Sequence, residues 1–200
     1  MDTLRAILIG GSSNVGKSTL AEYLATKLGW RYQSTDLLAR HPGRPWRPKP
    51  EEVPAHVAHH YRSLSVDELM DDVLSHYKRL WPTIEGIIAT HATDEAAERL
   101  TLEGSALWPE TVATLNLDTV AAIWLTASNC FLQERIYRES QFAAASAGEQ
   151  LLIRKFVERT QRYNDEMMGV VNHLGLASLD VEAVASLGEL ADTCLGLLKR

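Results

Sequence analysis

The chain has 200 residues, of which 46% are hydrophobic and 23% are charged, which is the composition of an ordinary globular domain. Its 20 basic and 26 acidic residues leave a net charge of −6, which argues against a general binder of nucleic acids or anionic membranes. The first apolar run, residues 6–9, is too short for a signal peptide or a membrane span, and no later run approaches membrane length. We therefore expect a soluble, cytoplasmic protein with no nucleic-acid and no membrane partner. Cys130 and Cys194 lie among apolar or small residues, which favours buried free thiols over a disulfide.

A phosphate-binding motif follows the first apolar run, which is typical of a strand buried on both faces. Residues 11–18 match G-x-x-x-x-G-K-[ST] at every fixed position, between that strand and an amphipathic helix. The two glycines let successive backbone N–H groups point at the phosphates, Lys17 would reach the β- and γ-phosphates, and Ser18 would ligate Mg²⁺. The predicted nucleotide-binding residues are Gly11, Ser12, Ser13, Asn14, Val15, Gly16, Lys17, Ser18 and Thr19.

Strand and helix patterns alternate along the rest of the chain. Four prolines exclude regular structure from the basic segment 41–50. Ser65 and Glu68 have the spacing of a capping box, and Pro82 suits the first turn of a further helix. The expected strands cover residues 30–34, 99–104, 120–125 and 176–179; the expected helices cover 65–80, 82–91, 131–139, 149–173 and 181–198. This alternation predicts an α/β fold with a mostly parallel sheet and right-handed crossovers.

Two carboxylates end predicted strands. Glu103 ends a buried strand where P-loop proteins hold the carboxylate on the magnesium side, so we expect it to act on the metal through water. Asp36 ends the second strand at the carboxyl edge of the sheet, where it can accept a proton from an attacking hydroxyl. A helix N-cap is the alternative role of Asp36, and it is compatible with that of a base. The chain lacks both the D-x-x-G and the N-K-x-D motifs of GTPases, which leaves a small phosphotransferase.

Arginines mark two further predicted parts of the site. Arg135 and Arg138 lie one helical turn apart before a small, polar segment, residues 139–149, which we call the lid segment. They would neutralise charge on the transferring phosphoryl group, although a solvated helix face is the alternative. Lys155, Arg159 and Arg162 form another basic face, solvated by default, of which one member could contact a phosphate.

The basic, proline-rich segment supplies the candidates for acceptor binding. Guanidinium groups would hold an anionic part of the acceptor, and an aromatic wall would hold an apolar part. The alternative is a solvated loop with Trp46 packed into the core. Three nearby histidines, His56, His59 and His60, fit a helix surface better than a metal site. The predicted acceptor residues are Arg40, Arg44, Trp46 and Arg47.

The chain resembles the nucleoside-monophosphate-kinase-like small-molecule kinases. Gly-Gly-Ser-Ser at 10–13 and Ser-Thr-Asp-Leu at 34–37 are similar to chloramphenicol phosphotransferase, whose matching aspartate serves as base. Leu-Glu-Gly at 102–104, with Leu-Trp-Pro at 107–109, is similar to 2-phosphoglycerate-kinase-like proteins. The acceptor region matches neither pattern, and the lid segment lacks the R-x-x-G-R form of adenylate-kinase-type enzymes. The resemblance implies a three-layer P-loop NTPase fold, a five-stranded sheet in the order 2-3-1-4-5 and a small lid.

These observations predict one P-loop kinase domain over residues 1–200, with a helical acceptor-binding insertion over 40–96. The expected activity is transfer of the γ-phosphoryl group of ATP, with Mg²⁺, to a hydroxyl or phosphate of a small molecule. The alternative is a nucleotide-binding regulatory or toxin-like module that acts through a protein partner. A monomer and a homodimer are both compatible with the sequence.

Overall fold

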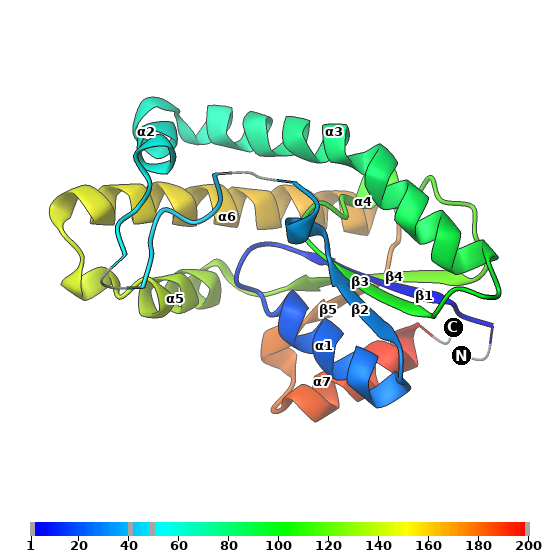
Figure 1. Cartoon of the computed structure of the whole chain (residues 1–200). Coiled ribbons are helices and arrows are strands. Elements are labelled where there is room, and N and C mark those ends of the chain that lie inside the picture. The colour runs from blue at the N-terminus through cyan, green and yellow to red at the C-terminus, as the bar shows by residue number, and fades with distance from the viewer. Residues whose placement is uncertain (1–2, 40–41, 49–50, 199–200) are drawn as a thin grey trace.

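The computed structural model describes residues 3–39, 42–48 and 51–198. Within these ranges, five parallel strands form one sheet in the order β2-β3-β1-β4-β5 (Figure 1). The strands are β1 (Ala6–Gly11), β2 (Arg31–Ser34), β3 (Leu100–Glu103), β4 (Val120–Thr126) and β5 (Ser178–Asp180). The helices are α1 (Lys17–Leu28), α2 (Ala55–Ser63), α3 (Val66–Thr93), α4 (Pro109–Val112), α5 (Asn129–Glu139), α6 (Ala147–His173) and α7 (Leu187–Leu197). The predicted α/β fold and strand order are confirmed.

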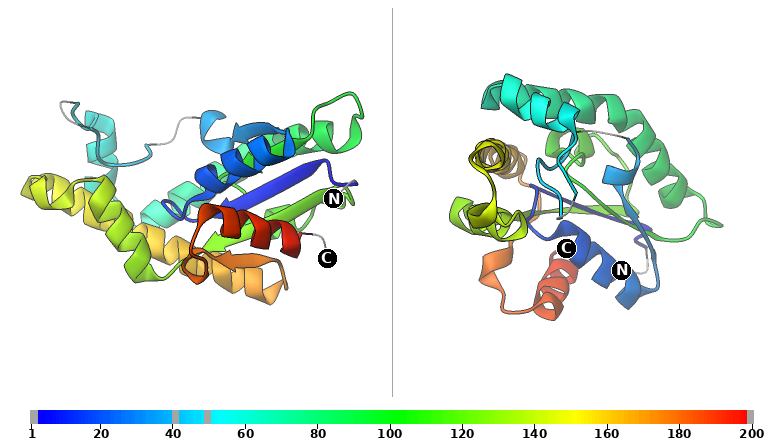
Figure 2. Two further views of the ribbon diagram at one scale, coloured as in Figure 1. Left: turned by 90° about the horizontal axis from the view of Figure 1, so that it is seen from below. Right: turned by 60° about the vertical axis from the view of Figure 1, so that its left-hand side comes forward.

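Helices cover both faces of the sheet, which gives three layers (Figures 1 and 2). Successive side chains of β1 alternate between these faces. Ile7 and Ile9 pack with α1 and α7, whereas Leu8 packs with α3, α4 and α6. Because both faces are covered, β1 has a continuous apolar sequence rather than an alternating one.

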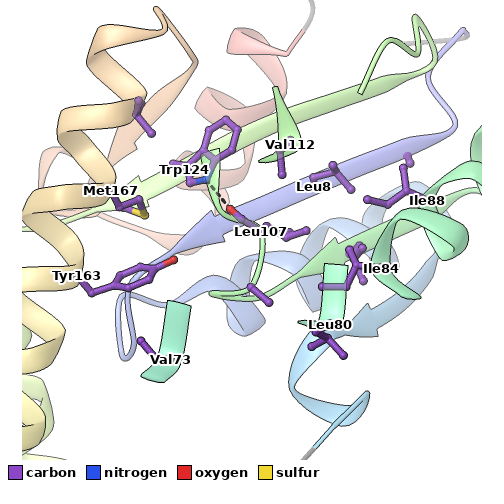
Figure 3. Packing of buried hydrophobic residues seen from close by; sticks show 14 of the residues in the cluster. Leu8, Val73, Leu80, Ile84, Ile88, Leu107, Val112, Trp124, Tyr163 and Met167 are labelled. Carbon is purple, nitrogen blue, oxygen red and sulfur yellow. Dashed lines mark hydrogen bonds between the residues drawn. The ribbon is translucent and has the colours of Figure 1, made fainter. Parts of the chain in front are cut away.

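The core on the α3 and α6 side constrains the backbone next to the phosphate-binding loop (Figure 3). Trp124 of β4 is buried, and its Nε1 donates a hydrogen bond to the carbonyl of Leu107 at 2.9 Å. The indole ring occupies the space that a Cβ atom on Gly10 would need. Only glycine therefore fits at position 10 beside this ring.

A third hydrophobic cluster lies away from the sheet. It joins the proline-rich segment to α2, α5, α6 and the start of α3. Its buried members are Trp46, Val57, Ala58, Tyr61, Leu69, Ile136, Leu152, Ile153, Phe156 and Val157. We call it the third cluster; it gives the end of the molecule beyond the sheet a core of its own.

The prediction that Pro82 begins a new helix is wrong. α3 is continuous from Val66 to Thr93 and contains Pro82, after the predicted capping box of Ser65 and Glu68. Proline interrupts one backbone hydrogen bond, but the buried stripe of α3 continues past it. Leu80 before Pro82 and Ile84 after it pack in the same core.

Several other expected boundaries shift. α6 begins at Ala147, because a second capping box between Ser146 and Glu149 opens it inside the lid segment. α7 begins at Leu187 rather than at 181.

Cys194 is buried as expected, but Cys130 is exposed in the first turn of α5, and both thiols are free. No helix in the described part of the chain is both long enough and apolar enough to cross a membrane.

Candidate active site

A cavity of about 710 Å³ opens at the carboxyl ends of β1, β2 and β3, where parallel sheets hold their ligands. Its walls come from the phosphate-binding loop, the turn after β2, the segment 42–48 and helices α2, α3, α5 and α6. The predicted nucleotide-binding residues on its surface are Ser13, Asn14, Gly16, Lys17, Ser18 and Thr19. Gly11, Ser12 and Val15 of the same loop are buried and do not line this cavity.

The loop has the backbone of a phosphate cradle. Gly11, Asn14 and Gly16 have φ angles of 144°, 64° and 109°, which turn the chain around a centre. Lys17 is buried, and its Nζ donates a hydrogen bond to the carbonyl of Ser12 at 2.8 Å. Burial lowers the pKa of Lys17, while the charges of Glu103 and Asp36 act in the opposite direction.

Side chains from distant elements hold this loop in place. The Ser105 hydroxyl donates to the carbonyl of Gly11 at 2.9 Å. Asn164 of α6 accepts from the Ser12 hydroxyl at 3.4 Å and donates to the carbonyl of Ala127 at 3.2 Å. The loop is therefore preorganised by contacts that span most of the sequence.

The candidate magnesium site combines a hydroxyl and a carboxylate. The Ser18 hydroxyl donates to Oε1 of the buried Glu103 at 3.1 Å, and the Tyr32 hydroxyl donates to the same oxygen at 3.2 Å. Burial and the neighbouring Glu103 raise the pKa of Tyr32 to about 12, so it stays a donor. In the described chain, Thr35 also lines this cavity, and its Oγ1 is buried beside Gly104 without a hydrogen-bond partner. Oxygen donors with one carboxylate fit Mg²⁺, which takes its remaining ligands from phosphates and water.

Asp36 stands on the cavity wall in the 3₁₀ turn Thr35–Leu37, with its side chain exposed. The residue that caps this turn is Ser34, whose hydroxyl accepts from the Asp36 N–H at 3.3 Å. The alternative that Asp36 is an N-cap is therefore wrong, because it sits inside the turn. Its carboxylate faces the cavity, where it raises the pKa of Lys17.

The two arginines that precede the lid segment, Arg135 and Arg138, lie in different surroundings. Arg135 lines the cavity, and a Cβ atom at Gly16 would lie 3.5 Å from its Nη1, next to the phosphate-binding loop. Its guanidinium also lies 5.5 Å from the centre of the Phe131 ring. Arg138 is exposed near the end of α5 and does not line this cavity.

A smaller cavity of about 240 Å³ adjoins the first beside α1 and α7. The two share Gly16, Thr19 and Arg135. Its remaining lining is mostly apolar and includes Phe131, Val15, Val181, Val184, Leu187 and Leu190. A flat, apolar ring joined to a phosphate chain fits two cavities in this arrangement.

Two of the four predicted acceptor residues, Arg44 and Arg47, line the main cavity. Trp46 is 9% exposed and packs edge-on against Phe156 at 4.9 Å between ring centres, which favours the core alternative for its side chain. Arg40 lies outside the described residues.

Glu139, at the end of α5, connects the phosphate-binding loop to the proline-rich segment. Its carboxylate accepts from Asn14 Nδ2 and forms an ion pair with Arg44. Between α5 and α6 the lid segment forms a 3₁₀ turn, Phe142–Ala144, where Phe142 stacks on Tyr137. The small, polar composition of this segment predicts that it is mobile without ligand.

The basic face of α6 is the clearest correction in the site. Arg159 is not solvated: it is 7% exposed, lines the main cavity, and donates from Nη1 to the Tyr61 hydroxyl at 3.0 Å. Lys155 donates to the carbonyl of Leu64 at 2.6 Å, and Arg162 pairs with Asp67 and Glu166, so both lie outside this cavity. Helices α2 and α3 cover the part of this face that carries Arg159, whereas Arg162 is exposed, as the sequence predicted.

The histidines of α2 lie at or near the surface of this helix. His56 and His59 are exposed, and His56 also lines the cavity. Among the described residues, no group of three or more histidine, cysteine, aspartate or glutamate side chains is arranged to hold a metal ion. The expectation of histidines on a helix surface therefore fits His56 and His59.

Comparison with solved structures identifies the fold. A gluconokinase from Sinorhizobium meliloti 1021 matches at 20% identity and a TM-score of 0.53, covering 98% of this chain and 91% of that one. A shikimate kinase from Aquifex aeolicus vf5 matches at 13% identity and a TM-score of 0.54, covering 97% of this chain and 96% of that one. A deoxyadenosine kinase from M. mycoides with bound dATP matches at 15% identity and a TM-score of 0.53, covering 98% of this chain and 100% of that one. This chain has the fold of the P-loop kinases. No protein-family model matches the sequence, and no curated protein does.

The sequence did not single out three residues of this site. Tyr32 shares Glu103 with Ser18, Asn164 holds Ser12, and Glu139 bridges Asn14 to Arg44. Glu139 fell inside the lid segment, but nothing local marked its partners. Tyr32 and Asn164 stand in ordinary strand and helix patterns, so only the fold reveals them.

Proposed function

We propose that this protein is an ATP-dependent phosphotransferase that transfers the γ-phosphoryl group to a hydroxyl of a small molecule. The observation that carries the proposal is that Asp36 and the phosphate-binding loop line one cavity, where the charge of Asp36 acts on Lys17. A carboxylate that shares a cavity with a phosphate-binding loop can act as a general base, because it can accept the proton of an acceptor hydroxyl there. The shared fold of small-molecule kinases supports it.

The nucleotide would occupy the two adjoining cavities. Its phosphates would lie in the loop from Gly11 to Thr19, with Lys17 and Arg135 beside them, and its base would enter the smaller cavity near Phe131 and Val184. Ser18 and Glu103 would hold Mg²⁺, which supplies positive charge that neutralises the phosphate oxygens. The acceptor would occupy the other half of the main cavity, between Asp36 and helices α2, α3 and α6, of which α2 and α3 belong to the helical insertion 40–96.

In the transfer, the acceptor hydroxyl gives its proton to Asp36 as its oxygen forms a bond to the γ-phosphorus. The bond from the γ-phosphorus to the bridging oxygen breaks, and its electron pair leaves with ADP. Lys17 and Arg135 stabilise the negative charge on the transferring group because they already lie at the loop before the reaction. Arg138, on the exposed side of α5, would act only if the lid segment rearranges.

The test is ADP release from Mg·ATP with and without a pool of small metabolites, followed by transfer of labelled phosphate to separate acceptors. Release that depends on an acceptor, with label recovered in that acceptor, is expected. The rival proposal, a regulatory or toxin-like module, predicts tight nucleotide binding that no small molecule stimulates. That outcome would overturn the kinase proposal.

A further inference from the structure

The acceptor half of the main cavity contains a buried positive charge that forms no ion pair with any described acid. Arg159 is 7% exposed, and among the described residues no carboxylate lies within ion-pair distance of it. Within the described residues, its guanidinium donates one hydrogen bond, which goes to the neutral hydroxyl of Tyr61. A buried, unpaired guanidinium is costly, so its place on a cavity wall indicates a ligand that pairs with it.

The guanidinium is held in a fixed position. It lies 4.6 Å from the ring centre of Phe156 and 5.8 Å from that of Tyr61. The Tyr61 hydroxyl accepts from Arg159 and donates to the carbonyl of Gly43 at 2.7 Å, which links it to the proline-rich segment. Contacts of this kind fix a planar fork before a ligand arrives, which favours binding of a carboxylate or phosphate.

The surrounding groups do not supply the missing negative charge. Burial raises the pKa of Tyr61, raises that of Tyr77 to about 12 and raises that of Tyr163 well above its usual value, so these phenols stay neutral. Two of the three acids on the cavity wall already have partners: Glu103 accepts from Ser18 and Tyr32, and Glu139 pairs with Arg44 and Asn14. The third acid, Asp36, is the proposed base.

Arg159 belongs to the acceptor half rather than to the phosphate-binding loop. The rings that hold it come from α2 and α6 in the third cluster. Its charge acts on Tyr61, Tyr77 and Tyr163, whereas the charges that act on Lys17 come from Glu103, Asp36 and Arg44. A second anion, separate from the ATP phosphates, therefore fits this position.

We propose that the phosphoryl acceptor carries a carboxylate or phosphate group besides its hydroxyl, and that Arg159 binds this anionic group. This inference rests on the proposed function, because it names the substrate class of the same cavity. Arg159 would fix one end of the acceptor, and the hydroxyl would face Asp36. Neutral alcohols of the same shape would leave the buried charge unpaired and would bind poorly.

The experiment measures binding to the full chain with the phosphate-binding loop saturated by Mg·ADP. Calorimetry compares hydroxy acids, sugar acids and sugar phosphates with their neutral counterparts: D-gluconate with D-glucitol, shikimate with its methyl ester, and glycerol 3-phosphate with glycerol. At least one acid should bind at millimolar or lower concentration, about tenfold or more tighter than its neutral partner. The carboxylate and phosphate members decide which anion the site takes.

Variants then assign the effect to one side chain. Arg159→Gln should weaken binding of the preferred acid by about 10- to 100-fold, and Arg159→Lys should recover part of it. Arg162→Gln is the matched control, because Arg162 lies on the same helix but pairs with Asp67 and Glu166 outside the cavity. Thermal unfolding and Mg·ADP affinity of each variant check that the fold is retained.

The inference is overturned if no acid of the panel binds, if acids and neutral partners bind equally, or if Arg159→Gln weakens Mg·ADP or Mg·ATP instead. Turnover separates it from the proposed function. An acid that binds through Arg159 but does not stimulate ADP release would refute the kinase and keep the anion site. A neutral alcohol phosphorylated equally by wild type and Arg159→Gln would refute the anion site and keep the kinase.

Discussion

At the residue scale, the ammonium group of Lys17 tests the phosphate site. It is buried and donates to Ser12 of its own loop, a contact that phosphate oxygens can replace. Lys17→Ala should abolish ATP turnover and weaken ATP binding measured by calorimetry. The fold should be retained in circular dichroism, because the lost side chain serves the ligand. Undiminished ATP affinity in this variant would remove the phosphate site from the proposal.

Asp36 separates the two candidate functions. Asp36→Asn keeps the shape of the side chain and removes its ability to accept a proton. Acceptor-dependent phosphorylation should fall by about 10²- to 10⁴-fold, the usual contribution of a general base, with ATP affinity and thermal stability unchanged. Since Ser34 rather than Asp36 caps the turn, no loss of capping complicates the measurement. A rate loss below about threefold would count against Asp36 as the base.

Glu139 places a negative charge beside the loop that would receive the ATP phosphates. Its hydrogen bond with Asn14 and its ion pair with Arg44 therefore compete with nucleotide binding. Glu139→Gln should tighten Mg·ATP binding by about 2- to 10-fold at low salt, and less at high salt. Glu134→Gln, about one and a half turns away on α5 and outside the cavity lining, is the control. Equal effects of the two variants would show that only the overall charge matters.

At the element scale, the lid segment between α5 and α6 is anchored through Phe142, which stacks on Tyr137 and packs against the third cluster. Gln150 donates to the carbonyls of Phe142 and Ala145 at 3.1 Å, and the segment is small and polar. Its amides should exchange rapidly in the free protein and more slowly when Mg·ATP and acceptor are bound. Hydrogen exchange with mass spectrometry measures both states. Strong and equal protection in the two would exclude a mobile lid.

Local sequence signals predicted those elements whose structure depends on near neighbours. Periodicity and one motif predicted the strand, glycine-rich loop and helix from residue 6 to 28. The position of Glu103 beside that loop could be predicted because it ends a buried strand. The prediction at Pro82 was wrong because proline is a local signal for the start of a helix. The buried stripe of apolar residues continues on both sides of it and keeps α3 in one piece. Arg159 misled because residue spacing shows which side chains share a helix face, but not which other helices cover that face.

At the scale of the whole molecule, the third cluster supports the acceptor half separately from the sheet. Trp46→Leu should loosen the packing against Phe156, raise the KM for the acceptor and leave Mg·ATP affinity unchanged. Steady-state kinetics with each substrate varied in turn measures the two effects. An equal loss of affinity for both substrates would mean that the two halves of the site share one support.

The separate packing of the two halves has a consequence for how such a protein changes over evolutionary time. The side chains behind the phosphate-binding loop, including Val15, Leu20 and Leu24, belong to a cluster that shares no buried member with the third cluster. Substitutions in groups without common contacts have nearly additive effects on stability. If the protein is the proposed kinase, its descendants could therefore exchange one acceptor for another by mutating around Trp46 and Tyr61, while the inherited phosphate-binding loop stays intact.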